Sequence, residues 1–367
     1  MSTLSLCMIV KDESQVIERC LRSVLPLIDA WTVVDTGSSD DTPAKVQSLL
    51  GHLPGQVHHR PWRNFAENRT EAFELNRGLA DYHLVIDADD WLEREADFHW
   101  PELTADLYSL PVHYSGIRYS RPQVFRSALP WCYQGVVHEY ADCSQAESRV
   151  LLKGLRYLCS CGEGARSRDS QKYLRDAQLL EEALCANPDD SRSVFYLAQS
   201  YRDAGLLQKA LEAYGWRIRL GGWSEERYIS HLERGRLFKR LRAGRSDVRN
   251  EFLDAYQLNS RRAEALVELA QLHRESNQWH LSKLFSARAA ELAFPRDGLF
   301  VEESAYSWRA ADELALASFY TGESHEARSL TERLLAGADD LGLERERLER
   351  NLLHYRAAES RCEVQCA

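Results

Sequence analysis

The segment 84–90, which reads Leu-Val-Ile-Asp-Ala-Asp-Asp, most constrains the fold of this chain. A short apolar run of this kind is typical of a buried strand, and the acidic cluster ends it. Carboxylates at the end of a buried strand lie at the rim of a sheet, where their oxygens can hold a hard divalent cation that binds a diphosphate. Acidic residues also fill turns and cap helices, so the segment needs support from the rest of the chain.

That support comes from the alternation of strand and helix patterns before it. We expect strands at 4–10, 32–34, 56–60 and 82–86 and helices at 13–25, 42–50 and 65–79. Such alternation with short connections predicts a mostly parallel sheet that is covered on both faces. Because ligands bind outside the carboxyl ends of such strands, Asp35 and Asp87 fall at the same edge. Short β segments follow from 107 to 158, so residues 1–162 are expected to form one α/β domain.

From about residue 167 the apolar residues repeat at helical spacing almost to the end. Ala198, Gly205, Ala210 and Tyr214 fit the tetratricopeptide pattern, in which a small residue lies where two helices touch. We expect further copies at 266–272 and 314–327, a capping helix at 343–355, a helical domain over 177–360 and a tail at 361–367. An unrelated helical bundle is the alternative.

Composition excludes some classes of function. The chain of 367 residues has a net charge of -10, which argues against non-specific binding to nucleic acid or an anionic membrane. No apolar run reaches the length of a transmembrane helix, and residues 1–10 lack the basic leader of a signal peptide. Most of the nine cysteines lie inside apolar patterns and are expected as buried thiols of a cytoplasmic protein. The close pairs lack the spacing of a zinc site.

Several groups of residues could carry chemistry. Val10, Lys11 and Glu13 follow the first strand and could frame a nucleobase, while Asp12 could cap the next helix. Asp35 could accept the imide N–H of uracil or thymine, or simply form a turn. Within the acidic cluster, Asp89 is expected to bind the metal, and Asp87 and Ala88 to contact the donor.

Two further stretches complete the predicted site. If the segment Val136–Glu139 is extended, His138 and Glu139 point in opposite directions, so one could meet the metal and the other could act as a general base. A surface Glu beside a packed His is the alternative. A Gly-rich basic segment at 163–176 suits a lid over a diphosphate, although it could be an ordinary linker. The remaining candidates for donor binding come from two polar stretches. Residues 67–71 supply Asn68 and Arg69, and the basic segment supplies Arg166, Ser167, Arg168, Lys172 and Tyr173.

Residues 4–90 resemble the nucleotide-binding half of the inverting GT-A glycosyltransferases of family 2. The resemblance lies in residues 7–13 (Cys-Met-Ile-Val-Lys-Asp-Glu), 34–40 (Val-Asp-Thr-Gly-Ser-Ser-Asp) and 86–89 (Ile-Asp-Ala-Asp). Residues 58–71, 135–140, 164–176 and 221–226 are similar to a subgroup with tetratricopeptide repeats, related to the peptide S-glycosyltransferases of glycocin synthesis.

This resemblance implies a manganese or magnesium ion held by Asp89 with help from His138, nucleoside contacts from Asp35, and single displacement with inversion. Many family members place an acidic pair on a helix as the base. No clear equivalent is found here, and Glu139 takes that role by elimination.

The predicted function is therefore a metal-dependent transfer of sugar from a nucleotide sugar, expected to be UDP-linked, to a peptide, protein or glycan. The repeats would line the acceptor cleft and could also support an oligomer; the expected acceptor contacts are Tyr196, Tyr201, Trp223 and Glu226. An interaction scaffold with a silent transferase domain is the alternative. A nucleotidyltransferase would need a Gly-rich phosphate loop after the first strand, which Lys11–Glu13 does not provide.

Overall fold

A computed structural model describes residues 2–160, 171–295, 298–337 and 344–366, with side chains up to residue 359. The chain divides into two compact units, residues 1–210 and 211–367. Helices α4 (Lys172–Ala186) and α5 (Ser191–Asp203) belong to the first unit, whereas the sequence predicted the helical domain to begin at residue 177. Most of the expected basic segment, residues 161–170, lies outside the described residues.

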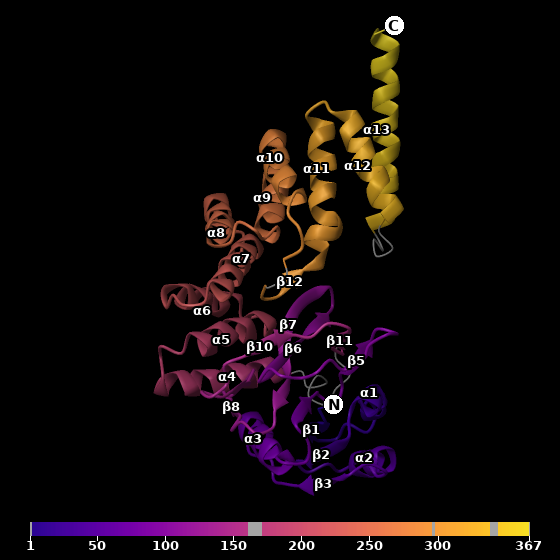
Figure 1. The fold of residues 1–367 in the computed structure, drawn as a ribbon. Coiled ribbons are helices and arrows are strands. Elements are labelled where there is room, and N and C mark those ends of the chain that lie inside the picture. The colour runs from indigo at the N-terminus through magenta and orange to yellow at the C-terminus, as the bar shows by residue number, and fades with distance from the viewer. Residues whose placement is uncertain (1, 161–170, 296–297, 338–343, 367) are drawn as a thin grey trace. The chain divides into compact units, whose positions relative to one another are not determined.

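The first unit is built on a mixed sheet with the strand order β3-β2-β1-β4-β7-β6-β11-β5 (Figure 1). Strands β3, β2, β1 and β4 run parallel, and β7 joins them antiparallel to β4. The predicted α/β sheet is therefore confirmed, with its parallel half at the N-terminus. The strands are β1 (Leu4–Val10), β2 (Ala30–Asp35), β3 (Gly55–His59), β4 (Tyr82–Val85), β5 (Trp91–Arg94), β6 (Leu107–Tyr114), β7 (Ile117–Arg126), β10 (Arg149–Leu151) and β11 (Leu155–Leu158), and a separate hairpin pairs β8 (Cys132–Gln134) with β9 (Tyr140–Asp142).

Helices cover both faces of the parallel half. The alternation of side chains along β1 sends Leu6 and Met8 into one core with α1 (Ile17–Val24) and α2 (Thr42–Leu50). Cys7 instead packs in a second core with Phe73 of α3 (Phe65–Asn76). Figure 1 shows α3 apart from α1 and α2.

The loops at the carboxyl edge are fixed by local caps. Asn64 caps α3, because its side chain accepts a hydrogen bond from the Glu67 N–H at 2.8 Å. Asp12 does not cap α1, which begins at Ile17 without a side-chain cap. Its carboxylate accepts from the backbone and hydroxyl of Ser39 instead, and so joins the loops that follow β1 and β2.

The second unit continues as antiparallel helix pairs. These helices are α7 (Ser224–Arg240), α8 (Arg245–Leu258), α9 (Glu264–Arg274), α10 (Trp279–Ala290), α11 (Ala310–Tyr320), α12 (Ser324–Gly337) and α13 (Glu344–Cys366), preceded by α6 (Leu207–Arg219), which crosses the unit boundary; a two-residue strand, β12 (Val301–Glu302), and a π-helical turn at Ala305–Arg309 lie before α11.

A small buried residue recurs in the first helix of successive pairs. Ala198, Gly235, Ala270 and Ala315 occupy this position in α5, α7, α9 and α11. The pair α7–α8, which contains Gly235, was not among the predicted copies. The copy expected at 314–327 instead crosses the turn between α11 and α12, where Gly322 has a φ of +93°. The last helix runs to Cys366, through the range expected as a tail.

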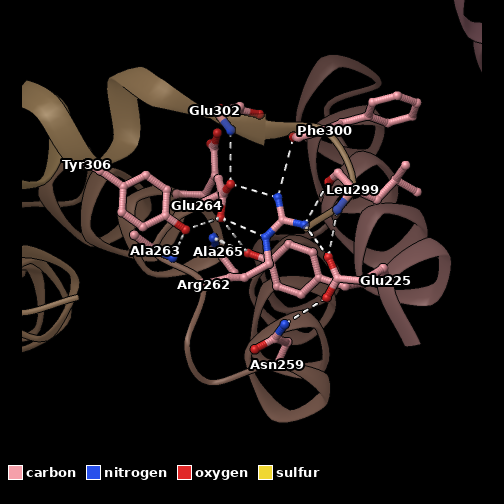
Figure 2. Close-up of polar contacts among 12 residues, drawn as sticks. Glu225, Asn259, Arg262, Ala263, Glu264, Ala265, Leu299, Phe300, Glu302 and Tyr306 are labelled. Atoms are coloured by element: carbon pink, nitrogen blue, oxygen red, sulfur yellow. Dashed lines mark hydrogen bonds and ion pairs between the residues drawn. The ribbon is translucent and has the colours of Figure 1, made fainter. Parts of the chain in front are cut away.

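Buried charges connect the helices of the second unit. The guanidinium of Arg262 is fully buried and donates to the carboxylates of Glu225 and Glu264 (Figure 2). It also donates to the Leu299 carbonyl at 2.8 Å, while the Tyr306 hydroxyl donates to Glu264. A buried guanidinium is tolerated only when its donors are paired in this way. The network therefore connects α7, α9 and the segment before α11 through Arg262.

No helix in the described parts of the chain is both long and apolar enough to cross a bilayer.

Candidate active site

The loop after β4 places Asp87 at the centre of the acidic edge. Its carboxylate pairs with Arg69 of α3 at 2.5 Å and with Arg121 of β7 at 3.2 Å. Burial opposes ionisation of Asp87, but the charges of the two arginines outweigh it and hold its pKa well below its usual range. Asp87 is therefore a permanently charged anchor within the loop.

The two following acidic residues experience the opposite effect. Burial, and then the charge of Asp87, raise the pKa of Asp89, while the nearby charge of Lys172 opposes the rise. Burial and Asp87 likewise raise the pKa of Asp90 to about 7. Asp90 accepts from the Ser160 N–H at 2.9 Å, whereas Asp89 is half-buried. Ionisation of Asp89 and Asp90 is thus less favourable than that of a free aspartate.

This donor set fits a divalent cation by its chemistry. Carboxylate oxygens are the ligands that Mg²⁺ and Mn²⁺ prefer, and a bound cation would offset the burial and the charge of Asp87 that raise these pKa values. Among the described residues, no three His, Cys, Asp or Glu side chains gather as a metal site. A Mg²⁺ ion that also binds substrate phosphates needs only one or two carboxylates from the protein, so the predicted ligand Asp89 suits that kind of site.

Glu139 is connected to the acidic loop through Arg69. The Arg69 Nε donates to Glu139 Oε1 at 2.7 Å, and the same guanidinium pairs with Asp87. Both carboxylates therefore lie within contact distance of one planar group, although they are far apart in the sequence. The hairpin that leads to Glu139 is joined to α3 as well, since the Tyr133 N–H donates to the Thr70 hydroxyl at 2.9 Å.

His138 has different partners from its neighbour. Its backbone is left-handed, with a φ of +53°, and its ring stacks on Tyr196 of α5 with centroids 4.0 Å apart. The two adjacent side chains thus reach a tyrosine and an arginine on different helices. The assignment of His138 as a metal ligand stays a prediction.

Asp35 lies at the carboxyl end of β2 and is buried. Its carboxylate accepts from the Ser38 N–H at 3.1 Å and lies 3.0 Å from Nδ1 of the exposed His59. In the adjoining loops, the carbonyl of Val10 accepts from Thr36, the N–H of Glu13 donates to Thr42, and Lys11 is exposed. These loops form a small polar edge beside Asp35, and the nucleobase contacts stay a prediction.

Other predicted residues make contacts that also have a structural role. The amide of Asn68 is fully buried and holds the backbone of Pro61 and Arg63. The Tyr201 hydroxyl donates to Glu181, and Glu226 forms a buried ion pair with Arg217.

The remaining predicted residues differ in burial and in position. Trp223, at the start of α7 in the second unit, is 52% exposed. Lys172 and Tyr173 open α4, and Ala88 is buried in the main core. Arg166, Ser167 and Arg168 lie outside the described residues.

The sequence reasoning missed Arg121 and Tyr157. The Asp87 N–H donates to the Tyr157 hydroxyl at 3.1 Å, and the Arg121 guanidinium lies 4.5 Å from the centroid of that ring. Both come from strands beyond the parallel half, which only tertiary pairing brings to the loop. For Arg121, the available signal was a cation in the same β segment as the apolar residues Val124 and Phe125, which are buried.

Fold and site together define an α/β domain with an acidic, nucleotide-compatible edge, followed by a helical repeat. Residues 5–109 match the model of the family Glycosyl transferase family 2. The sequence motifs predicted this match for the N-terminal part of the chain.

Two curated proteins are similar to parts of this chain. A TPR repeat-containing protein of Synechococcus elongatus is 34% identical over 209 residues, which cover 52% of this chain and 50% of that protein. An uncharacterized glycosyltransferase of Rickettsia felis is 34% identical over 95 residues, or 26% of this chain and 31% of that protein. The chain thus spans half or less of the length of these curated relatives.

A tetratricopeptide repeat protein from Parabacteroides merdae superposes on 53% of this chain and 72% of its own length, at 16% identity and a TM-score of 0.40. The helix pairs described above, and not this superposition, define the repeat.

Proposed function

We propose that this chain is a glycosyltransferase that moves a sugar from a nucleotide-sugar donor, most simply a UDP-sugar, to a hydroxyl or thiol of a peptide, protein or glycan. The observation that carries the proposal is the bridge of Arg69 between Asp87 and Glu139. It brings an acidic residue to the edge where a family 2 domain would bind its donor. A base and a donor site must lie this close for transfer to occur in one step.

The chain's own residues would divide the work of binding the donor. Asp35 would accept the imide N–H of the base, and Arg69 and Arg121 would keep Asp87 in a fixed place in the donor loop. Asp89 would hold the divalent cation, which when bound supplies positive charge to the diphosphate leaving group. Lys172 is close enough to affect the pKa of Asp89 and would add to that charge.

Glu139 would take the proton of the acceptor nucleophile. In the proposed step, the acceptor oxygen or sulfur forms a bond to the anomeric carbon while the bond from that carbon to the diphosphate breaks. The proton goes to the Glu139 carboxylate, and the electron pair of the broken bond goes to the nucleoside diphosphate. Attack from the face opposite the leaving group would invert the anomeric centre.

A donor-hydrolysis screen of the full chain tests this proposal without knowledge of the acceptor. The purified protein is incubated with a panel of nucleotide sugars and Mn²⁺ or Mg²⁺, and the release of nucleoside diphosphate is followed. We expect release from at least one UDP-sugar, and loss of that release with EDTA.

Calorimetry with UDP and Mn²⁺ is the companion measurement. If UDP does not bind in the presence of the metal and no donor is hydrolysed, the proposed glycosyltransferase activity is contradicted. The chain is then better described as an interaction scaffold.

A further inference from the structure

The connection between β8 and β9 holds Glu139 in a conformation that the hairpin does not favour by itself. Gly135 has a φ of +100° and His138 a φ of +53°. A left-handed backbone is unfavourable for a residue other than glycine. His138 and Tyr140, on either side of Glu139, are both exposed. Contacts from outside the hairpin must therefore stabilise this turn.

Helix α3 supplies one set of contacts. Thr70 accepts from the backbone of Tyr133 in β8, and Arg69 holds the Glu139 carboxylate. These contacts fix the incoming strand and the end of one side chain. They do not reach the backbone at His138, where the chain turns.

Helix α5 supplies the contacts at the turn. The Arg192 Nη2 donates to the His138 carbonyl at 3.1 Å, and the Tyr196 ring lies parallel to the His138 imidazole, with an angle of 13° between them. The Arg192 guanidinium lies 4.8 Å from the ring centroid of Tyr140 and 4.9 Å from that of Tyr196. Arg192 and Tyr196 are four residues apart and so share one face of the helix.

The start of α5 is itself well fixed. The Asp190 carboxylate accepts from the N–H groups of Arg192 and Ser193 and from the Ser193 hydroxyl. Arg192 thus projects from a capped first turn, and its backbone does not depend on the hairpin for its position.

We propose that Arg192 and Tyr196 are positioning residues that hold the His138 turn, and through it Glu139, in the orientation needed for transfer. The first helix of the repeat pattern is then part of the transferase site, in addition to any role in binding acceptors. This inference rests on the proposed function for the role of Glu139, whereas the contact between α5 and the turn stands without it.

Variants of the full chain separate positioning from folding. Arg192→Ala should lower kcat for transfer by about 10- to 100-fold while the KM for the donor stays near the wild-type value. Arg192→Lys should recover part of the loss, because an ammonium can still donate to the carbonyl and lie over the rings. Tyr196→Leu should lower kcat as well, because it removes the stacked ring, and Tyr196→Phe, which keeps the ring, should recover part of that loss.

Lys209→Ala is the matched control. Lys209 also lies over a tyrosine ring, that of Tyr201 at 5.0 Å, and pairs with Glu181 instead of the hairpin. It should have wild-type kcat.

Hydrogen exchange of the amides at 135–140 gives a second readout that needs no substrate. We expect faster exchange in Arg192→Ala and unchanged exchange in Lys209→Ala. Wild-type kcat in Arg192→Ala, or unchanged exchange at the turn, would overturn the inference. If the wild-type chain transfers no sugar, the proposed function fails, and exchange alone decides whether α5 holds the turn.

Discussion

Arg69 and Glu139 are joined by a hydrogen bond of 2.7 Å from Nε to Oε1, although 70 positions separate them in the sequence. Nη2 of the same guanidinium donates to Asp87. A guanidinium stays protonated at any physiological pH, so it holds both carboxylates in place before a substrate arrives. The candidate base and the donor loop are thus one electrostatic unit.

Replacing Arg69 with Met should destabilise the first unit. The side chains of Arg69 and Glu139 are 13% and 11% exposed, so the change leaves a poorly solvated carboxylate without its cation. We expect a loss of about 3 kcal/mol in the free energy of unfolding, measured by urea denaturation. Arg63→Met is the control, because Arg63 and Glu67 are half-exposed and 3.9 Å apart, and it should cost little. Equal losses in the two variants would contradict the prediction.

Asp89→Asn should weaken metal-dependent binding of the donor. The variant keeps the shape of the loop but removes the charge that would hold the cation. By calorimetry, we expect the affinity for UDP in the presence of Mn²⁺ to fall at least about tenfold, with an unchanged circular dichroism spectrum. Asp41→Asn, at an exposed carboxylate that pairs with Lys45, should bind as the wild type does. A wild-type affinity of Asp89→Asn for UDP in the presence of Mn²⁺ would contradict the assignment of Asp89 as a metal ligand.

Glu139→Gln should separate binding from transfer. The glutamine oxygen can still accept from Arg69, so the hairpin keeps its place, but the amide cannot take a proton. We expect donor affinity near the wild-type value and a fall in the transfer rate of about 10²- to 10⁴-fold. Glu147→Gln changes an exposed carboxylate in the same part of the chain and should leave the rate unchanged. Transfer at the wild-type rate in Glu139→Gln would place the base elsewhere.

His83 should make the stability of the first unit depend on pH. Burial, and then the charge of Arg77, lower its pKa to about 4, and the Asn76 amide donates to its Nδ1. The unfolded residue titrates near 6.5, so between about pH 6.5 and pH 4 the unfolded chain binds a proton that the folded chain does not. Stability is therefore lost as the pH falls through this window, by about 2 kcal/mol at about pH 5.

Urea unfolding at about pH 7.5 and pH 5 checks this prediction. His83→Gln should lower the difference between the two values, while His99→Gln, at an exposed position, should keep it. The same difference in both variants would show that another group is responsible.

Gly235→Ala should destabilise the second unit. A Cβ at this position would lie 2.4 Å from Phe252 Cε1, so α7 and α8 would have to separate. Although alanine favours helices, we expect a net loss of about 1–3 kcal/mol in thermal or urea unfolding followed at the helical signal. Gly337→Ala is the control, because nothing lies within 4 Å of its added Cβ. Combination with Phe252→Leu should recover part of the loss, and no recovery would argue against this contact as the cause.

The sequence was sufficient for features that depend on local pattern. Alternating strand and helix patterns placed Asp35 and Asp87 at the same edge of a parallel sheet, and the sheet was confirmed. The small residue at Ala198 was enough to predict a helix pair. The pattern did not predict the pair α7–α8, where Gly235 fills the same position, because a lone glycine in a helix pattern does not by itself indicate close packing.

The sequence did not predict which side chains surround the acidic residues. The pattern Asp-x-Asp gave no means of telling which carboxylate is paired with cations. Arg121 and Tyr157 come from β7 and β11, whose antiparallel and parallel pairings depend on long-range contacts. The pairing of β7 with β4 brings Arg121 to Asp87, which Arg69 of α3 also binds, whereas Asp89 and Asp90 have raised pKa values.

By itself, the sequence determined the class of fold and the edge at which the acidic residues gather, because hydrophobic period and turn chemistry are local properties. The tertiary structure decided what each charged side chain faces. It placed one guanidinium between Asp87 and Glu139, and it brought Arg192 and Tyr196 of the first repeat helix to the turn at His138. Such contacts depend on how distant elements pack, and no local pattern in the chain encodes them.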